Sequence, residues 1–187
     1  SDLQNFKLSS EDLKVFQKVF ERDISVNTKR AIHGDLKHFI SWYHSMNQET
    51  FTFSRLTERD VIDYKRYCVE HLKHSANTVN RRLVHVRLLC KNALKMGLFS
   101  NSDPTANIKT LVLQPLAPKG LTQPELRALL KEVEIRGNLR DRLIIEMLVG
   151  AGFRVSEIAA LTVNDIFISE RKGHAVVRHG KGNKTRS

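Results

Sequence analysis

Two basic residues and one acid in the C-terminal part of the sequence have the types and spacing of a phosphodiester site. Arg154 follows a corner containing Gly150 and Gly152, and Glu157 comes three residues later on the same face of a predicted helix. A guanidinium oriented by a carboxylate can donate two parallel hydrogen bonds to a phosphate. Lys181 lies in a glycine-flanked turn, from which an ammonium can swing onto a ligand. The pattern predicts an inward, fixed arginine and a mobile lysine at a phosphate.

The same residues also fit an arrangement without chemistry. Arg154 and Glu157 would then form a buried ion pair, and Lys181 would be a solvated loop residue. Spacing alone slightly favours this structural interpretation. A P-loop is excluded because "GKGNKT" lacks the G-x-x-x-x-G-K-[ST] spacing. His71 and His74 in "HLKH" resemble half of a metal site, but no Cys or His cluster lies nearby, so no metal is predicted.

The elements that must position these residues follow from apolar periodicity and helix caps. Four helices are predicted in the first part, opening at Ser9 or Ser10, at Asn27 or Thr28, at Thr57, and at Ser75 or Asn77. In the fourth helix the packing stripe is predicted to comprise Val79, Leu83, Val86, Cys90, Ala93 and Gly97. "LVLQPLAPKG" has two prolines and no strong period, which is typical of a linker.

Beyond the linker, three helices and then strands at "DIFIS" and "HAVVRHG" are predicted. The helix within "NLRDRLIIEMLVGAG" is apolar enough to be buried on several sides. We therefore divide the chain into an all-α domain at residues 1–112, a linker at 113–119, and part of a second domain at 120–187.

The charge of the chain favours a polyanionic partner. The sequence contains 31 Lys and Arg and 20 Asp and Glu, which gives a formal net charge of +11. Residues 73–102 and 171–187 each contain six basic residues and no acid, so both blocks are candidates for phosphate contacts. Basic residues four positions apart share a helix face and form two ridges, each of which also fits a merely solvated face. Charge alone does not choose between DNA, RNA and acidic lipid as the partner. The residues predicted to contact phosphates are Lys29, His33, Lys37, Arg81, Arg87, Lys91, Lys95, Lys184 and Arg186.

Other sequence features place the protein in the cytoplasm. No apolar run approaches the roughly 20 residues that cross a bilayer, and the N-terminus has no apolar signal core. Cys68 and Cys90 fall in helical patterns and are expected to be small, buried and reduced rather than joined in a disulfide.

Two longer motifs resemble those of the tyrosine recombinases, the phage-integrase and Xer-like family. "GAGFRVSEIAALTVNDI" followed by "VVRHGKGNKTR" is similar to the family pattern T-G-x-R-x-S-E-[LI]-x-x-L-x-x-x-D-[IL], a strand, and G-K-G-x-K-x-R. Ala151 stands where threonine is usual. The matching positions are Gly152, Arg154, Ser156, Glu157, Leu161, Asp165, Gly180, Lys181, Gly182, Lys184 and Arg186. "NTKRAIHGDLKHFISWY" and "SANTVNRRLVHVRLLCKNALKMGLFSNSDPTANI" resemble helices of the family's core-binding domain, so the resemblance covers nearly the whole chain.

The resemblance implies a mainly α fold, with a four-helix, SAM-like core-binding domain followed by an incomplete α/β catalytic domain carrying a small antiparallel sheet. It implies that Arg154 binds the non-bridging oxygens of the scissile phosphate, that Glu157 supports the site, and that Lys181 protonates the leaving 5′-oxygen. The family reaction needs no metal or cofactor and proceeds through a 3′-phosphotyrosine. The implied partners are double-stranded DNA and further recombinase protomers, because the family works as a tetramer on two duplexes.

The resemblance also indicates what this chain is expected to lack. The family's second cluster, His-x-x-Arg followed by His or Trp, and its nucleophilic tyrosine would lie beyond residue 187. Tyr43, Tyr64 and Tyr67 belong to the core-binding part and are expected to be packing or surface residues. We therefore predict a DNA-binding fragment of a site-specific recombinase that performs no strand transfer alone. The alternative is a non-catalytic DNA-binding decoy or regulator with the same architecture. A helix-turn-helix repressor is a weaker alternative, because it leaves Arg154 without a role.

Overall fold

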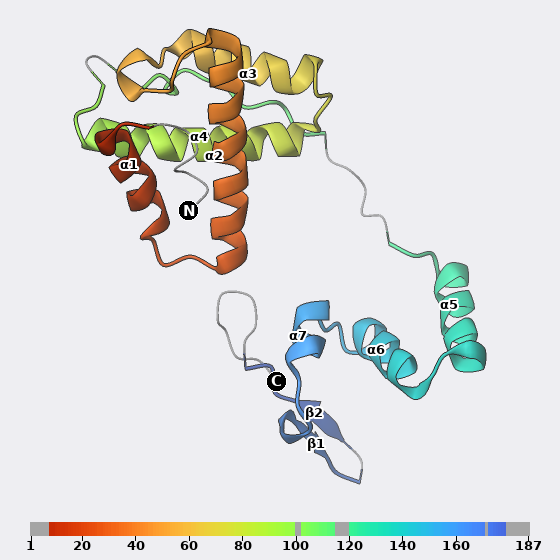
Figure 1. Cartoon of the computed structure of the whole chain (residues 1–187). Helices are drawn as coiled ribbons and strands as arrows, with labels where there is room; N and C mark the ends of the chain where they lie inside the picture. The colour runs from red at the N-terminus through yellow and green to blue at the C-terminus, as the bar shows by residue number, and fades with distance from the viewer. Residues whose placement is uncertain (1–7, 100–101, 115–119, 171, 179–187) are drawn as a thin grey trace. The chain divides into compact units, whose positions relative to one another are not determined.

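The computed structural model describes residues 8–99, 102–114, 120–170 and 172–178. Two compact units divide the chain, which we call unit 1, Ser1–Pro115, and unit 2, Leu116–Ser187 (Figure 1). Each unit has its own helices.

Unit 1 is a bundle of four α-helices with one short 3-10 helix. The elements are α1 (Ser10–Phe20), α2 (Val26–Asn47), η2 (Phe53–Arg55), α3 (Glu58–Glu70) and α4 (Ala76–Lys95). Figure 1 shows α4 crossing α2, and α4 contacts each of the other three α-helices. The fourth helix therefore organises the bundle, and side chains along its inner face meet all three neighbours.

Side-chain hydroxyl groups cap the N-termini of these helices. Thr57 caps α3 and forms a reciprocal pair with Asp60, and Ser75 caps α4, both as predicted. The second helix was predicted to open at Asn27 or Thr28, but Ser25 is its cap and accepts a hydrogen bond from the backbone N–H of Thr28. That prediction was wrong because Ser25, Asn27 and Thr28 can each cap a helix, and only Ser25 lies outside the helical segment, which begins at Val26.

The core of unit 1 is an aromatic cluster between the helices. Phe39 lies at its centre, with ring centroids 4.9 Å from Tyr64, 5.9 Å from Phe51 and 6.1 Å from Trp42. All four rings are buried. The contacts with Tyr64 and Phe51 are edge-to-face and that with Trp42 is stacked, and both arrangements stabilise a core beyond the area that they bury.

The predicted packing stripe of α4 is buried from Val79 to Ala93. Gly97, which was predicted to continue the stripe, instead lies beyond the helix end, is exposed, and has a φ of 72°. A glycine tolerates this left-handed conformation without steric cost, so it ends the helix rather than packing.

The segment that leaves α4 is fastened to the bundle by side chains. The side-chain amide of Asn80 donates from Nδ2 to the Leu111 carbonyl at 2.9 Å, and its Oδ1 accepts from the Leu111 backbone N–H at 2.7 Å. Lys65 donates to the carbonyl of Lys109, and Arg87 donates to that of Ile108, each at 2.7 Å. The chain therefore stays attached to unit 1 as far as Leu111.

Unit 2 is helical and then forms a two-stranded sheet. Its elements are α5 (Gln123–Arg136), α6 (Leu139–Gly150), α7 (Val155–Ala160), η3 (Val163–Asp165), β1 (Ile166–Ile168) and β2 (Gly173–Ala175). Thr122 caps α5 and pairs reciprocally with Glu125. The strands are antiparallel, with Phe167 opposite His174. The predicted mainly α fold with a small antiparallel sheet is therefore confirmed.

The apolar side chains of unit 2 are largely exposed. No residue of α5 or α6 is buried by the described part of the chain, and Leu139 is 82% exposed. The prediction that α6 is buried on several sides is therefore wrong for this structure. Apolar periodicity shows which side chains need cover, but the described residues of unit 2 do not supply that cover.

Within the described ranges, no helix combines the length and apolar character of a membrane-spanning segment.

Candidate functional site

Arg154 is placed by the short helix that follows it. Arg154 is the cap residue of α7, and Gly152, just before it, adopts a φ of 63° at the corner between α6 and α7. One carboxylate oxygen of Glu157 accepts from the backbone N–H of Arg154 at 2.9 Å, and the other accepts from its guanidinium at 2.6 Å. The helix start thus fixes both the backbone and the side chain of the arginine.

Burial of this pair is unequal. The side chain of Glu157 is 1% exposed, while that of Arg154 is 57% exposed. The expectation of an inward guanidinium is therefore wrong here, because α7 buries only its acid. The buried Glu157 carboxylate binds one edge of the Arg154 guanidinium. The remaining N–H groups of this half-exposed guanidinium face solvent. This geometry suits an anion that approaches from outside unit 2.

Asp165 organises the neighbouring strands. Its carboxylate accepts from Arg178 Nε at 2.5 Å and from Thr162 through both backbone and hydroxyl. The hydrogen bond from Arg178, followed by those from Thr162, lowers the pKa of Asp165 to about 2. A cavity of about 350 Å³, whose lining includes Glu157, Asp165 and Arg178, lies beside this cluster. Sequence reasoning missed Arg178, whose only sign was membership of the C-terminal basic block.

Lys181, Lys184 and Arg186 lie outside the described residues.

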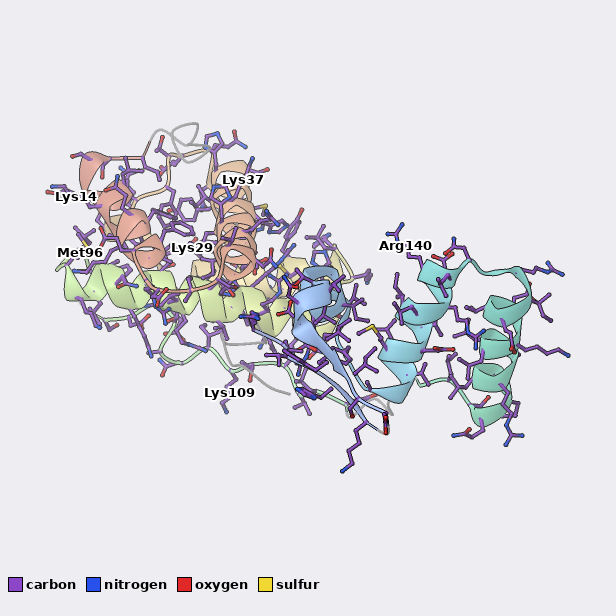
Figure 2. The ribbon with its side chains drawn as sticks, turned by 90° about the horizontal axis from the view of Figure 1, so that it is seen from below. Lys14, Lys29, Lys37, Met96, Lys109 and Arg140 are labelled. Carbon is purple, nitrogen blue, oxygen red and sulfur yellow. The ribbon has the colours of Figure 1, made fainter. Side chains whose placement is uncertain are left out.

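The predicted basic ridges of unit 1 divide into exposed and attached residues (Figure 2). Lys37, which Figure 2 labels, is exposed, and so are Lys91 and Lys95. Lys29 and His33 are half-buried, and the His33 ring lies 6.1 Å from that of Phe20. The exposed lysines are free to meet a phosphate, whereas the His33 ring lies against α1.

Two predicted contacts already have partners within unit 1. Arg87 is half-buried and donates to the Ile108 carbonyl, so part of its guanidinium holds the exit segment. Arg81 donates from Nη1 to Asp35 at 2.5 Å. Sequence spacing alone could not show these contacts, because both join segments far apart in the chain.

Charge is distributed unevenly among the helices of unit 1. The sequences of α2 and α4 contain a single acid, Asp35, which is buried. Their Lys and Arg residues are Lys29, Arg30, Lys37, Arg81, Arg82, Arg87, Lys91 and Lys95. Helices α1 and α3 instead carry both signs. The solvent-facing surface of α2 and α4 is therefore free of acids, and we call it the α2–α4 face.

A partly buried polar network joins α2, α3 and α4 and was not predicted. Arg82 Nη1 lies 3.1 Å from His38 Nε2 and 3.3 Å from His74 Nδ1, and His38 Nδ1 lies 2.9 Å from the hydroxyl of Tyr64. Burial, followed by the charge of Arg82 and then that of His74, lowers the pKa of His38 to about 4. The neutral ring can accept from the guanidinium, which a protonated ring could not do.

The pKa of His38 predicts a pH dependence for unit 1. Between pH 6.5 and 4 the unfolded chain binds a proton at His38 that the folded chain does not bind, so acidification over this range favours unfolding. The free energy of unfolding should fall by less than about 1.4 kcal/mol per pH unit, because the ring is only half-buried and solvent screens its interactions. Urea unfolding measured between pH 6.5 and 5 reports the slope, above the range in which carboxylates titrate.

His38→Gln should remove this component of the slope, while His71→Gln, at an exposed position of the same unit, should retain it. A slope that is identical in wild type and His38→Gln would assign the pH dependence to other groups.

Burial raises the pKa of two tyrosine hydroxyls and two cysteine thiols in unit 1. Tyr43 and Tyr64 are buried, and burial raises the pKa of each hydroxyl. Cys68 and Cys90 are buried free thiols, as expected, and burial raises the pKa of both. A phenol or thiol with a raised pKa is a poor nucleophile at neutral pH. Among the described residues, no three His, Cys, Asp or Glu side chains are grouped as metal ligands.

Comparisons with known proteins assign both units. The Phage integrase SAM-like domain matches residues 10–109, and the Phage integrase family matches residues 119–187. The chain is 32% identical over 173 residues to tyrosine recombinase XerD of Halalkalibacterium halodurans, which covers 91% of this chain and 56% of that protein. It is 28% identical over 165 residues to tyrosine recombinase XerC of Roseiflexus castenholzii, which covers 86% of this chain and 51% of that protein.

A solved structure has a similar fold. The Tn1549 transposon integrase, in complex with circular intermediate DNA, matches with a TM-score of 0.61 and 16% identity, over 94% of this chain and 58% of the integrase chain. The chain spans about half the length of the curated relatives it matches. Because one family domain matches more than half of the chain and a second matches the remainder beyond the linker, the chain belongs to the phage integrase family of tyrosine recombinases.

Proposed function

We propose that this chain is a DNA-binding part of a site-specific recombinase that cuts and rejoins DNA through a 3′-phosphotyrosine. The observation that supports DNA binding is the α2–α4 face, which exposes Lys37, Lys91 and Lys95 on two helices whose single acid, Asp35, is buried. Lysines that contact DNA phosphates release the counterions condensed on the DNA, and this release favours binding. The similar fold of an integrase that holds DNA in its solved structure supports the same partner.

Unit 2 would contribute half of a phosphoryl-transfer site. Arg154, with Glu157 fixing one edge of its guanidinium, would bind the non-bridging oxygens of the scissile phosphate and stabilise the charge that develops on them. Lys181 would protonate the leaving 5′-oxygen. The lysine pKa of about 10.4 would have to fall for this role, and cationic neighbours with partial desolvation act in that direction.

The remaining partners are further protomers of the recombinase. We propose that the whole protein works as a tetramer on two duplexes in the cytoplasm, as the family resemblance implies. Unit 1 would hold one DNA arm in each protomer while the catalytic parts exchange strands.

The salt dependence of DNA affinity tests the α2–α4 face. Lys91→Ala/Lys95→Ala should weaken binding to duplex DNA of any sequence, because phosphate contacts carry no base information. The slope of log K against log salt should become shallower by about 0.9 for each lost contact, or about 1.8 for the pair. Fluorescence anisotropy with a labelled duplex at several salt concentrations gives both quantities.

The matched control is Lys14→Ala/Lys18→Ala, which removes two exposed lysines at the same spacing from α1 (Figure 2 labels Lys14). It should leave the slope nearly unchanged, since α1 lies outside the α2–α4 face. Equal slopes for the two double variants would show that binding depends on net charge alone and would refute this face as the contact.

A nicked suicide substrate tests the assignment of the tyrosines. We expect the 187-residue chain to form no covalent protein–DNA adduct that survives denaturation, because Tyr43 and Tyr64 are buried and Tyr67 is half-buried in unit 1. Gel electrophoresis after denaturation measures the adduct. An adduct that disappears when one of these three tyrosines is replaced by phenylalanine would overturn the assignment.

A further inference from the structure

Asp35 is the one carboxylate in α2 and α4, and three basic residues of α4 surround it. Its Oδ2 accepts from Arg81 Nη1 at 2.5 Å and lies 2.7 Å from His85 Nδ1, while its Oδ1 lies 3.6 Å from Arg82 Nε. The Asp35 side chain is 6% exposed. A buried carboxylate is costly unless it is paired, so the basic groups of α4 account for its presence there.

Arg81 differs from the other two basic residues because it reaches the surface. Its side chain is 46% exposed, whereas those of Arg82 and His85 are 13% exposed. Only Nη1 has a hydrogen-bond partner within the described part of the chain. Its other N–H groups are therefore available to an anion, while Asp35 fixes the direction of the guanidinium.

Arg81 also lies on the same side of α4 as the exposed lysines of the α2–α4 face. Residues 10 and 14 positions along an α-helix return to within about 80° and 40° of the starting direction. Lys91 and Lys95 occupy those positions, and both are exposed. A phosphate backbone that contacts the two lysines can therefore also approach Arg81.

We propose that Asp35 is a positioning residue for DNA binding, which holds the Arg81 guanidinium ready to donate to a phosphate. The inference rests on the proposed function, that is, on DNA binding by the α2–α4 face. A free arginine side chain loses rotamer freedom when it binds, and this loss opposes association. The hydrogen bond to Asp35 already orders the Arg81 side chain in the free protein, so less side-chain entropy is lost when DNA binds. Asp35 therefore strengthens DNA binding even though its own charge repels phosphate.

A purely structural role would give a different result. Asp35 also joins α2 to α4 through Arg82 and His85, so its removal can disturb the bundle without any connection to DNA. In that case the effect of removing the carboxylate would not depend on Arg81. A positioning role requires the effect to pass through Arg81.

The test is a double-mutant cycle of Asp35→Asn and Arg81→Ala, with duplex affinity measured by anisotropy at one fixed salt concentration. Asp35→Asn alone should weaken binding about three- to tenfold, the equivalent of ordering one long side chain. Arg81→Ala should weaken it at least as much, and Asp35→Asn should cause no further weakening in the Arg81→Ala background.

Two outcomes of the cycle overturn the proposal. The first is unchanged or tighter binding by Asp35→Asn, which would make the carboxylate a simple source of repulsion. The second is full weakening by Asp35→Asn when Arg81 is already alanine, which would make its role structural. If wild-type protein does not bind duplex DNA at all, the proposed function fails instead, and the two failures are therefore distinct.

A measurement on wild-type protein keeps the test decisive if Asp35→Asn unfolds unit 1. The ¹⁵N relaxation of arginine Nε reports how rigid each guanidinium is before DNA is added. Arg81 should be clearly more ordered than Arg66, an arginine of α3 with a similar exposure of 55% and a looser contact of 3.6 Å to Asp63. Equal mobility of the two side chains would overturn the proposal without any substitution.

Discussion

Phe39→Ala should lower the free energy of unfolding of unit 1 by about 3–5 kcal/mol. The side chain is fully buried, and its ring lies against those of Trp42, Phe51 and Tyr64. These neighbours are large and rigid, so they cannot collapse into the space that the ring leaves. The loss therefore includes both the transfer of apolar surface and the cost of a cavity. Urea unfolding followed by the fluorescence of Trp42, the only tryptophan, reports on this unit.

The matched control is Phe167→Ala in β1, where the ring is half-exposed and belongs to unit 2. It should leave the unfolding midpoint of unit 1 unchanged. Phe39→Leu should cost less than Phe39→Ala, because it keeps most of the buried volume. A loss below about 1 kcal/mol for Phe39→Ala would mean that the aromatic cluster repacks around the smaller side chain.

The helices of both units could be predicted from local chemistry. Thr57 with Asp60, and Thr122 with Glu125, combine a capping hydroxyl with an acid three residues later, and both pairs form in the structure. The start of α2 could not be fixed in this way. Ser25, Asn27 and Thr28 can all cap a helix, and the choice depends on the backbone of the turn from α1, where Ser25 has a φ of −58° and a ψ of 151°.

The candidate site divides in the same way into local and distant contacts. Arg154 and Glu157 are three residues apart on one helical turn, so their contact follows from spacing. Arg81 and Asp35 are 46 residues apart, and their contact exists only because α4 crosses α2. The sequence did contain a sign of it, since Asp35 is the single acid in two helices rich in Lys and Arg.

The exposure of individual side chains could be predicted least well, because it depends on which elements pack together and not on the local sequence alone. The apolar sequence of α6 predicts that the helix needs cover, but it does not say which residues provide cover. Likewise, Arg154 was expected to point inward, whereas Glu157 is the buried member of the pair. Periodicity identifies a face that prefers to be buried, and only the packing of the unit decides whether it is.

This exposure of unit 2 leads to a large expected difference in amide hydrogen exchange within the 187-residue chain. Amides of α6 should exchange at least about 1,000-fold faster than those in the middle of α4, relative to their intrinsic rates. A helix of 12 residues with no buried side chain among the described residues gains little from packing, and isolated helices of this length are marginal in water. The amides of α4 are instead protected by the stability of unit 1, about 5 kcal/mol or more for an ordinary domain, and each 1.4 kcal/mol corresponds to a factor of ten.

Exchange measured by mass spectrometry or NMR at two protein concentrations distinguishes the possible results. Fast exchange in α6 at both concentrations would agree with the exposure of Leu139 and Leu143. Protection of α6 that rises with concentration would mean that a second copy covers its apolar side chains. Protection equal to that of α4 at both concentrations would contradict the prediction and require cover from within the same chain. Because α4 and α6 are compared in one sample, differences in pH, temperature or unfolding of the whole protein cannot produce the contrast.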